Sequence, residues 1–510
     1  MIIPGTMKTK KEDVDMKQRL LFARAYEEDA LPRIPKDARP QFHLTPCVGW
    51  MNDPNGFSYY QGEYHLFYQY NPYKTEWDDM HWGHAVSPDL LHWRYLPAAL
   101  APDEWYDADG CWSGSAIELP DGKQLLIYTG IRKLSHNSEE ALQVQCLALG
   151  DGVNYEKLEQ NPVISGDSLP DGLSPFNFRD PKIWREKDGS YRCIVGTCDQ
   201  EQKGRLLLYR SDDALSWRFE SVFIENDGRF GLMWECPDFF EMDGRKLLLV
   251  SPQFMLPEGF EYHNGNGTVC LIGDTDDSGR HFAYTQHQSV DYGIDFYAAQ
   301  TILTPDGRRV MIGWLQNWDA CQNNRKEQIW YGQMTLPREI FLRNGRLCQR
   351  PLRELEQYRR NRVEYKNISV EDETVLYGIE GRCVELFITV RPKDPEKLFQ
   401  KFSLRFAQNE KYRSSLSFRP HERIVKIDRK CSGSRRAIIH QRRCLVPNKD
   451  GEISMRVILD RNSIEAFLND GDQVMSAVIM TEQAAKGISF HAIGEVEIDV
   501  VKYDLCLEEE

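Results

Sequence analysis

The sequence predicts an all-β protein, a five-bladed β-propeller followed by a C-terminal β-sandwich. Three observations support this fold: short strand-like runs fill the chain, one turn motif recurs at a nearly constant interval, and the strand pattern resumes after a break near residue 351. The 510 residues are 41% hydrophobic and 28% charged, the composition of an ordinary globular protein. A chain of this length has room for two or three domains of about 100–200 residues each.

The strand-like runs are short, rich in β-branched and aromatic residues, and bounded by Gly, Pro, Asn or Asp. In the first two-thirds of the chain they are Tyr64–Tyr70, Gln124–Tyr128, Leu142–Leu149, Tyr191–Gly196, Leu206–Tyr209, Lys246–Val250 and Val310–Trp314. In the last third they are Val384–Val390, Phe402–Phe406 and Ser454–Leu459. This pattern is typical of an all-β chain.

The recurring turn places an acidic residue a few positions before an aromatic one, at Asp89, Asp151, Asp213 and, more loosely, Asp277. The intervals between these residues are 62, 62 and 64 positions. A fixed period of about 60 residues accommodates four short strands with their loops, the content of one propeller blade. Four turns and their flanking sequence therefore predict about five blades. The alternative is a long sandwich in which the spacing is a coincidence.

The boundaries of the elements follow from breaks in this rhythm. We expect an N-terminal helical extension over residues 1–37, with one helix at Met16–Leu31, and then the propeller over residues 38–350. After Pro351, Leu and Tyr recur at helical spacing, which predicts a linker helix over residues 351–366. The second strand-rich region, residues 367–510, is expected to form the β-sandwich.

Charge and composition exclude several classes of protein. The net charge of −15 opposes the phosphate neutralisation that drives nucleic-acid binding, and we interpret the basic stretch Arg429–Arg443 as a solvated strand face. No run approaches about 18 apolar residues, so no membrane span is expected. The start, Met1–Leu21, lacks the apolar core of a secretory signal. Thirteen scattered cysteines indicate free thiols in a reducing compartment, and hence a cytoplasmic protein.

Four polar residues stand at similar places before the four turns. Asp53, Ser113, Asp180 and Glu235 precede their turns by 36, 38, 33 and 42 positions. Since the innermost strand of each blade lines the central channel of a propeller, we expect these side chains to converge there. Taken singly each has a structural explanation, such as turn chemistry at Asp53 or an ion pair between Arg179 and Asp180.

Three carboxylates in one channel are harder to explain structurally, because like charges in a partly desolvated space repel one another. Glycoside cleavage uses this arrangement, since it needs an ionised carboxylate to attack the anomeric carbon and a protonated carboxyl to donate to the leaving oxygen. Asp53 and Glu235 are the candidate pair. Aromatic residues offer faces for sugar rings, with about half of them expected to be packing residues. They are Trp50, Trp77, Trp82, Trp112 and Trp314.

The contexts of these residues resemble the signature motifs of glycoside hydrolase family 32, the invertases and β-fructofuranosidases. The matching segments are Trp50–Gly56, Trp112–Ser115, Phe178–Pro181, Trp234–Asp238, Tyr292–Ala298, Met334–Glu339 and, late in the chain, Asp460–Phe467. The resemblance covers roughly residues 40 to 505 and implies a five-bladed propeller, a sandwich, and retention of anomeric configuration.

The resemblance also implies roles for individual residues. Asp53 would be the nucleophile, Glu235 the acid and base, and Asp180 the residue that stabilises the transition state, with Arg179 limiting the charge repulsion. Cys236 could tune Glu235 or be an inert thiol. The expected substrate-binding residues are Asn52, Gln69, Trp77, Trp112, Ser113, Arg179 and Trp314.

The predicted function is hydrolysis of terminal, non-reducing β-D-fructofuranosyl residues from sucrose and short fructo-oligosaccharides. Hydrolysis of sucrose 6-phosphate and fructosyl transfer are alternatives that use the same catalytic residues, and a sugar-binding propeller without catalysis is the non-enzymatic one. No cofactor is expected. No metal is expected either, since His81-Trp82-Gly83-His84 has no accompanying acidic ligand motif. A homo-oligomer formed through the sandwich is a further hypothesis.

Overall fold

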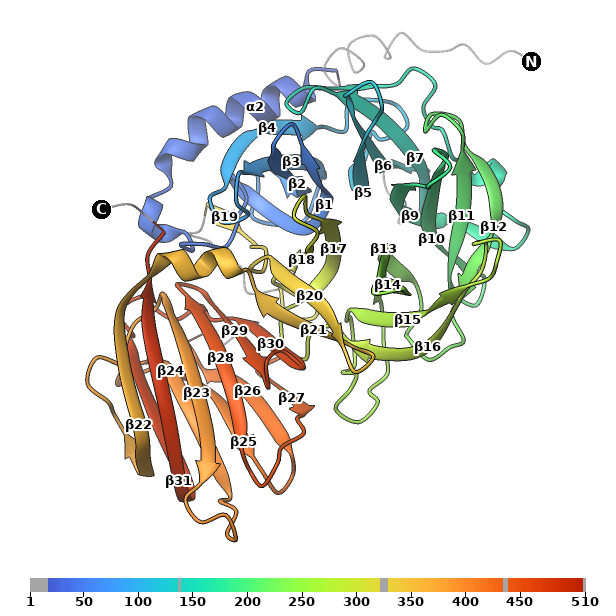
Figure 1. Ribbon diagram of the computed structural model, residues 1–510. Coiled ribbons are helices and arrows are strands. Elements are labelled where there is room, and N and C mark those ends of the chain that lie inside the picture. The colour runs from blue at the N-terminus through green and yellow to red at the C-terminus, as the bar shows by residue number, and fades with distance from the viewer. Residues whose placement is uncertain (1–16, 136–137, 139, 322–328, 434–438, 508–510) are drawn as a thin grey trace, which may run out of the picture.

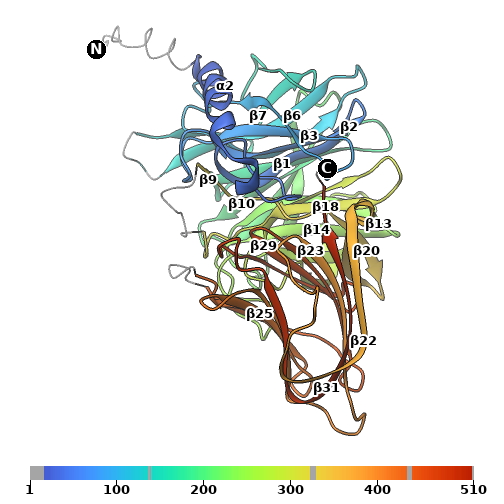
Figure 2. The same ribbon diagram turned by 90° about the vertical axis from the view of Figure 1, so that its left-hand side faces the viewer.

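The structure, a computed structural model, describes residues 17–135, 138, 140–321, 329–433 and 439–507. It confirms the predicted fold class: five blades surround a common axis, and a sandwich domain is attached to one side of the ring (Figure 1). Turned by 90°, the two domains lie one above the other (Figure 2). No helix in the described ranges is long and apolar enough to cross a membrane.

Each blade is an antiparallel sheet whose first strand lies nearest the axis (Figure 1). Blade I holds β1 (Gly49–Tyr60), β2 (Glu63–Asn71), β3 (His81–Ser87) and β4 (Arg94–Leu100). Blade II holds β5 (Cys111–Glu118), β6 (Gln124–Lys133), β7 (Ala141–Gly150) and β8 (Tyr155–Lys157). Blade III holds β9 (Leu173–Arg185), β10 (Tyr191–Asp199), β11 (Gly204–Ser211) and β12 (Arg218–Glu225).

Two further blades complete the ring. Blade IV holds β13 (Trp234–Met242), β14 (Arg245–Pro252), β15 (Val269–Thr275) and β16 (Phe282–Ser289). Blade V holds β17 (Tyr297–Leu303), β18 (Arg309–Trp314), β20 (Arg338–Arg343) and β21 (Arg346–Pro351). The short strand β19 (Trp330–Tyr331) follows β18 in sequence but pairs in parallel with β1. This pairing ties the last blade to the first and closes the ring.

The repeated turn has a common cause. The carboxylates of Asp89, Asp151 and Asp213 each accept hydrogen bonds of 2.8–3.0 Å from the backbone N–H groups two and three residues later. Such turns are stabilised by an acidic side chain that replaces a backbone acceptor. In the fourth copy the prediction of Asp277 is wrong by one residue, because Asp276 is the residue whose carboxylate accepts a backbone hydrogen bond, from the N–H of Arg280 four residues later at 2.9 Å.

The N-terminal helix α2 spans Arg19–Ala30 and lies along blade I beside β4 (Figure 1). It is shorter than the predicted Met16–Leu31, whose first residue lies outside the described ranges. At its C-terminal end, Leu31 begins a separate 3-10 turn that contains Pro32. The helix is attached to β4 by the Glu27 carboxylate, which accepts a 3.0 Å hydrogen bond from the backbone N–H of Ala98.

The predicted linker helix over residues 351–366 is wrong in kind and extent. Only Arg353–Tyr358 is helical, as the 3-10 helix η4, and β22 begins at Arg359. The apolar residues Leu352, Leu355 and Tyr358 recur every three positions, which is the period of a 3-10 helix. Leu352 and Leu355 are fully buried, so this short turn anchors the chain between the two domains.

The C-terminal domain is one continuous hydrogen-bonded sheet of ten strands that folds over a shared apolar core. Its strands are β22 (Arg359–Thr374), β23 (Val384–Pro392), β24 (Lys401–Gln408), β25 (Arg413–Arg419), β26 (Ile424–Cys431), β27 (Gln441–Leu445), β28 (Ile453–Asp460), β29 (Ser463–Leu468), β30 (Gln473–Val478) and β31 (Gly487–Leu505). The long strand β31 pairs with β24 through its first half and with β23 through its second. This change of partner joins the two layers of the sandwich.

A buried network of charges joins the two domains. His43, from the segment before β1, makes 2.8 Å contacts with Asp460 and Glu465 of the sandwich. Arg338 of blade V pairs with the same Glu465 at 2.6 Å and with Asp291 at 3.0 Å. Burial alone would lower the pKa of His43, but hydrogen bonds to the two carboxylates outweigh it and raise the pKa to about 9. The motif Asp460–Phe467 therefore has a structural role at the domain interface.

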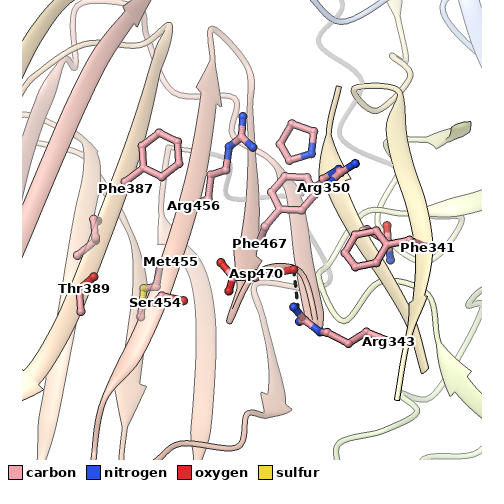
Figure 3. A pocket seen from close by; sticks show the side chains of 13 residues that line it. Phe341, Arg343, Arg350, Phe387, Thr389, Ser454, Met455, Arg456, Phe467 and Asp470 are labelled. Atoms are coloured by element: carbon pink, nitrogen blue, oxygen red, sulfur yellow. Dashed lines mark hydrogen bonds between the residues drawn. The ribbon is translucent and has the colours of Figure 1, made fainter. Parts of the chain in front are cut away.

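A crevice of about 480 Å³ also lies between the domains (Figure 3). Blade V and the sandwich contribute aromatic and arginine side chains to it, among them Phe341, Arg343, Arg350, Phe387, Arg456 and Phe467. The guanidinium carbons of Arg350 and Arg456 lie 5.3 Å from the ring centres of Phe341 and Phe387, respectively. Such cation–π contacts are attractive and stabilise the positions of both side chains. None of these residues belongs to the innermost strands.

Candidate active site

Every innermost strand contains, in a corresponding part of the blade, one residue more than the neighbouring strand with which it pairs. In β1, β5, β9, β13 and β17 the register against the next strand shifts by one, within residues 51–54, 112–114, 179–182, 235–238 and 297–300. A β-bulge of this kind bends the strand and turns a side chain away from its alternating direction. The five bulges thus turn side chains of the innermost strands out of their alternating directions.

The polar residues were predicted to stand at similar places in the repeat, but their positions relative to the bulges differ by one or two residues. Glu235 is the last paired residue before its bulge, and Asp180 is the first residue within its own. Asp53 lies one position further on than Asp180. Asp180 and Cys236, which occupy equivalent positions, have left-handed φ values of +65° and +46°. The three carboxylates therefore come from three successive positions of the bulge, and the extra residue brings them together.

Residues at the bulges of blades I to IV line a cavity of about 360 Å³. Nine of the ten predicted site residues line it: Asn52, Asp53, Gln69, Trp77, Trp112, Ser113, Arg179, Asp180 and Glu235. The tenth, Trp314, is fully buried and does not line the cavity. It packs behind the wall, with ring centres 5.9 Å from Trp50 and 4.9 Å from Trp318.

The two carboxylate oxygens of Asp53 have different surroundings. Its Oδ2 accepts a hydrogen bond from the Ser113 hydroxyl at 2.9 Å and lies 3.6 Å from the Cys236 sulfur. Its Oδ1 is buried and has no hydrogen-bond partner among the described residues. Burial, and then the negative charge of Glu235, raise the pKa of Asp53 to about 6. Most of the carboxylate is thus still ionised at neutral pH.

Glu235 is held at both oxygens. Arg179 Nε donates to Oε1 at 3.0 Å, and the hydroxyl of Tyr297 donates to Oε2 at 2.6 Å. Tyr297 was not among the predicted site residues, although its segment was among the matching motifs. It follows Glu235 by 62 positions, the period of the repeat, so the spacing contained the signal. These two donors fix the orientation of the carboxyl group.

Asp180 completes the cluster. Its Oδ2 accepts a hydrogen bond from the backbone N–H of Cys236 at 2.9 Å and lies 3.7 Å from the sulfur of the same residue. Burial raises the pKa of Asp180, and Arg179, whose Nε is 4.0 Å away, opposes that shift. The thiol of Cys236 contacts Asp53 and Asp180, whereas the sequence suggested that it would tune Glu235. Burial raises its pKa well above the usual value, which keeps it a thiol.

Four lining residues were not predicted. Gln253, Phe254, Asn266 and Trp318 come from loops of blades IV and V. The five aromatic candidates divide, as expected, between the cavity wall and the core. Trp77, which is 46% exposed, and Trp112 line the cavity. The other three, Trp50, Trp82 and Trp314, are buried in the core. No group of three or more His, Cys, Asp or Glu in the described part of the chain is arranged to hold a metal ion.

Hydrolysis of a glycosidic bond needs two carboxyl groups in different surroundings, because one must attack or activate water while the other donates a proton. Asp53, held by a hydroxyl and a thiol, and Glu235, held by a guanidinium and a hydroxyl, lie in different surroundings of one cavity. Together with the propeller that presents them, they fit the class of glycoside hydrolases.

Comparison with known proteins identifies the family. Residues 43–351 match the model of the glycosyl hydrolases family 32 N-terminal domain, and residues 354–505 match that of the family 32 C-terminal domain. The chain belongs to glycoside hydrolase family 32, and it is an enzyme that cleaves glycosidic bonds.

The relatives span almost the whole chain. A raffinose invertase of Escherichia coli is 36% identical over 480 residues, 94% of this chain and 97% of the relative. A sucrose-6-phosphate hydrolase of the same species is 36% identical over 464 residues, covering 89% and 91%. Among solved structures, a family 32 β-fructofuranosidase of Bombyx mori is 34% identical, with a TM-score of 0.80 and coverage of 98% and 99%. A mutant of that enzyme was solved in complex with sucrose.

Proposed function

We propose that this enzyme is a retaining β-fructofuranosidase that releases terminal, non-reducing β-D-fructofuranosyl residues from sucrose and short fructo-oligosaccharides. The observation that carries the proposal is the convergence of Asp53 and Asp180 in one cavity with a Glu235 carboxyl that is fixed by two donors. The names of the relatives, an invertase and a β-fructofuranosidase, support the same substrate class.

In the proposed mechanism, the Asp53 carboxylate attacks the anomeric carbon of the fructosyl unit and forms a covalent fructosyl-enzyme intermediate. Glu235 gives its proton to the leaving oxygen, so that the leaving sugar departs as a neutral alcohol. Water then enters, Glu235 removes its proton, and the ester with Asp53 is broken. Two inversions at the same carbon give net retention.

The remaining residues are assigned to binding and charge control. Asp180 would accept hydrogen bonds from fructose hydroxyls as positive charge develops on the ring. Arg179, between Glu235 and Asp180, compensates part of the negative charge of the cluster. The residues proposed to line the fructose pocket are Asn52, Gln69, Trp77, Trp112 and Ser113. Trp314 is assigned to packing against Trp50 and Trp318 and not to the fructose pocket.

Sucrose is the preferred substrate in this proposal. Among the described residues that line the cavity, Arg179 is the one cation, and it already binds Glu235. A phosphate on the leaving glucose therefore finds no free partner in this part of the wall. Sucrose 6-phosphate is the second candidate, because several relatives carry the name of sucrose-6-phosphate hydrolases. Fructosyl transfer would use the same catalytic groups with a sugar in place of water.

The test is a comparison of initial rates on sucrose, sucrose 6-phosphate, kestose and inulin. We expect sucrose to give the highest kcat/KM, and Asp53→Ala and Glu235→Ala each to lose roughly 10²-fold or more. A near-wild-type rate in either variant would show that the assignment of catalytic residues is wrong. A higher kcat/KM for sucrose 6-phosphate would move the proposal to the second candidate.

For location and assembly we propose a cytoplasmic enzyme that forms homo-oligomers through the sandwich. All thirteen cysteines are free, as suits a reducing compartment. Cell fractionation tests the location, and enzyme found in the extracellular fraction would refute it. Light scattering after size-exclusion chromatography tests the assembly, and a monomer at micromolar concentration would refute it.

A further inference from the structure

Phe254 is held in a backbone conformation that an aromatic residue seldom adopts. Its φ is +55°, in the left-handed region, and among the described residues it is the one aromatic residue with such an angle. Bulky residues are outliers in this region, because the side chain crowds the backbone. The side chain is also 65% exposed, so it gains little from burial. Strain and exposure both oppose folding, and strained residues gather where function requires them.

The neighbouring backbone fixes this conformation. The N–H of Gln253 donates to the carbonyl of Met233 at 3.0 Å, while Met255 exchanges two hydrogen bonds with Gly265, at 2.7 and 3.0 Å. The Met255 side chain is 4% exposed and packs into the core of blades III and IV. Phe254 stands between these two anchored residues and has to project outward. A glycine at this position would adopt the same angle without strain.

The projecting ring lines the catalytic cavity. Phe254 lies in the loop between β14 and β15 and shares the cavity wall with Asp53 and Glu235. Its neighbours in that wall, Gln253 and Asn266, carry amides that suit sugar hydroxyls. Its exposed apolar face offers a sugar ring a flat surface on which to stack. The ring is thus an exposed apolar surface in the wall of the catalytic cavity.

We propose that Phe254 determines specificity for the leaving group, by stacking against the sugar ring attached to the fructosyl unit. The inference rests on the proposed fructofuranosidase function and adds to it a preference for leaving groups that are themselves sugar rings. Contact with a part of the substrate that does not react can still be used to lower the barrier of the chemical step. The strained loop holds the ring ready before the substrate arrives.

The test compares two substrates that differ in the leaving group alone. Sucrose releases a glucose ring, whereas methyl β-D-fructofuranoside releases methanol, which has no ring to stack. In Phe254→Gly, we expect the ratio of kcat/KM for sucrose to kcat/KM for the methyl fructoside to fall roughly three- to tenfold, the usual worth of one aromatic contact. Phe254→Tyr keeps the ring and should restore the ratio. Phe254→Gly should also melt at a higher temperature than wild type, because the backbone strain is relieved.

Leu256 provides the matched control. It lies two positions further along the same loop, is 79% exposed, and does not line the cavity. Leu256→Gly should keep the wild-type ratio of the two substrates. An unchanged ratio in Phe254→Gly, or an equal fall in Leu256→Gly, would overturn the inference. Failure of the wild-type enzyme to release fructose from either substrate would instead refute the proposed function.

Discussion

The raised pKa of Asp53 predicts that removing its charge stabilises the protein at neutral and alkaline pH. Because the folded state holds this proton more tightly than the unfolded chain, wild-type stability is lost progressively as pH rises from about 4 to about 6. A shift from 3.8 to about 6 corresponds to about 3 kcal/mol at 1.36 kcal/mol per unit. Since the side chain is partly exposed to the cavity, we expect Asp53→Asn to gain about 1–3 kcal/mol above pH 7.

The assay is the melting temperature of wild type and Asp53→Asn from pH 4 to pH 8. For a chain of this length the gain corresponds to about 1–3 °C. The difference should be close to zero at pH 4, increase up to about pH 6 and then stay constant. Asp277→Asn, in an exposed turn, is the control for removal of a carboxylate and should show no such dependence. A pH-independent difference, or a lower melting temperature for Asp53→Asn at pH 8, would refute the reasoning.

Three further predictions concern catalysis and the domain interface. The nucleophile must be ionised, so kcat/KM should fall tenfold per pH unit below about pH 6. Ser113→Ala removes a hydrogen bond to the Asp53 carboxylate and should therefore move this acidic limb of the pH profile to higher pH. An acidic limb that does not move would contradict the assignment. Tyr297→Phe removes a donor to the Glu235 carboxylate and should lower kcat on sucrose by roughly 10–100-fold, whereas a wild-type rate would exclude a role for the hydroxyl. His43→Ala removes the ion-pair partner of buried Asp460 and one of the two partners of Glu465, and it should cost about 3–5 kcal/mol, measured by calorimetry; an unchanged melting temperature would show that the network does not contribute to stability.

The fold class was predictable because it depends on features that repeat. Strand composition and a turn at a period near 62 require no knowledge of tertiary contacts, and the structure has the five blades and the sandwich that they predict. The fourth turn was placed on Asp277 because two adjacent aspartates, Asp276 and Asp277, are equivalent in a pattern but not in a hydrogen bond. The linker was misread because a three-residue apolar spacing over two turns resembles an α-helix.

The site was predictable where it depends on motifs and unpredictable where it depends on loops. Asp53, Asp180 and Glu235 converge in the cavity, but the bulges that bring together three different strand positions leave no periodic trace in the sequence. Trp314 was expected in the pocket wall because a tryptophan can stack on a sugar ring or pack in a core. Its complete burial shows that it packs in the core. Phe254 gave no sequence signal, since its importance lies in a backbone angle.

The buried charge network also limits how this enzyme can be divided or recombined. Arg338 and His43 belong to the propeller half, whereas two of the acids that neutralise them, Asp460 and Glu465, arrive more than a hundred residues later. A propeller synthesised without its partner would keep the pair between Arg338 and Asp291 but lose both acids that bind His43. Grafting a foreign sandwich onto residue 351 would succeed only if the donor supplied both acids in register. The two halves are therefore expected to be inherited, and engineered, as a single unit.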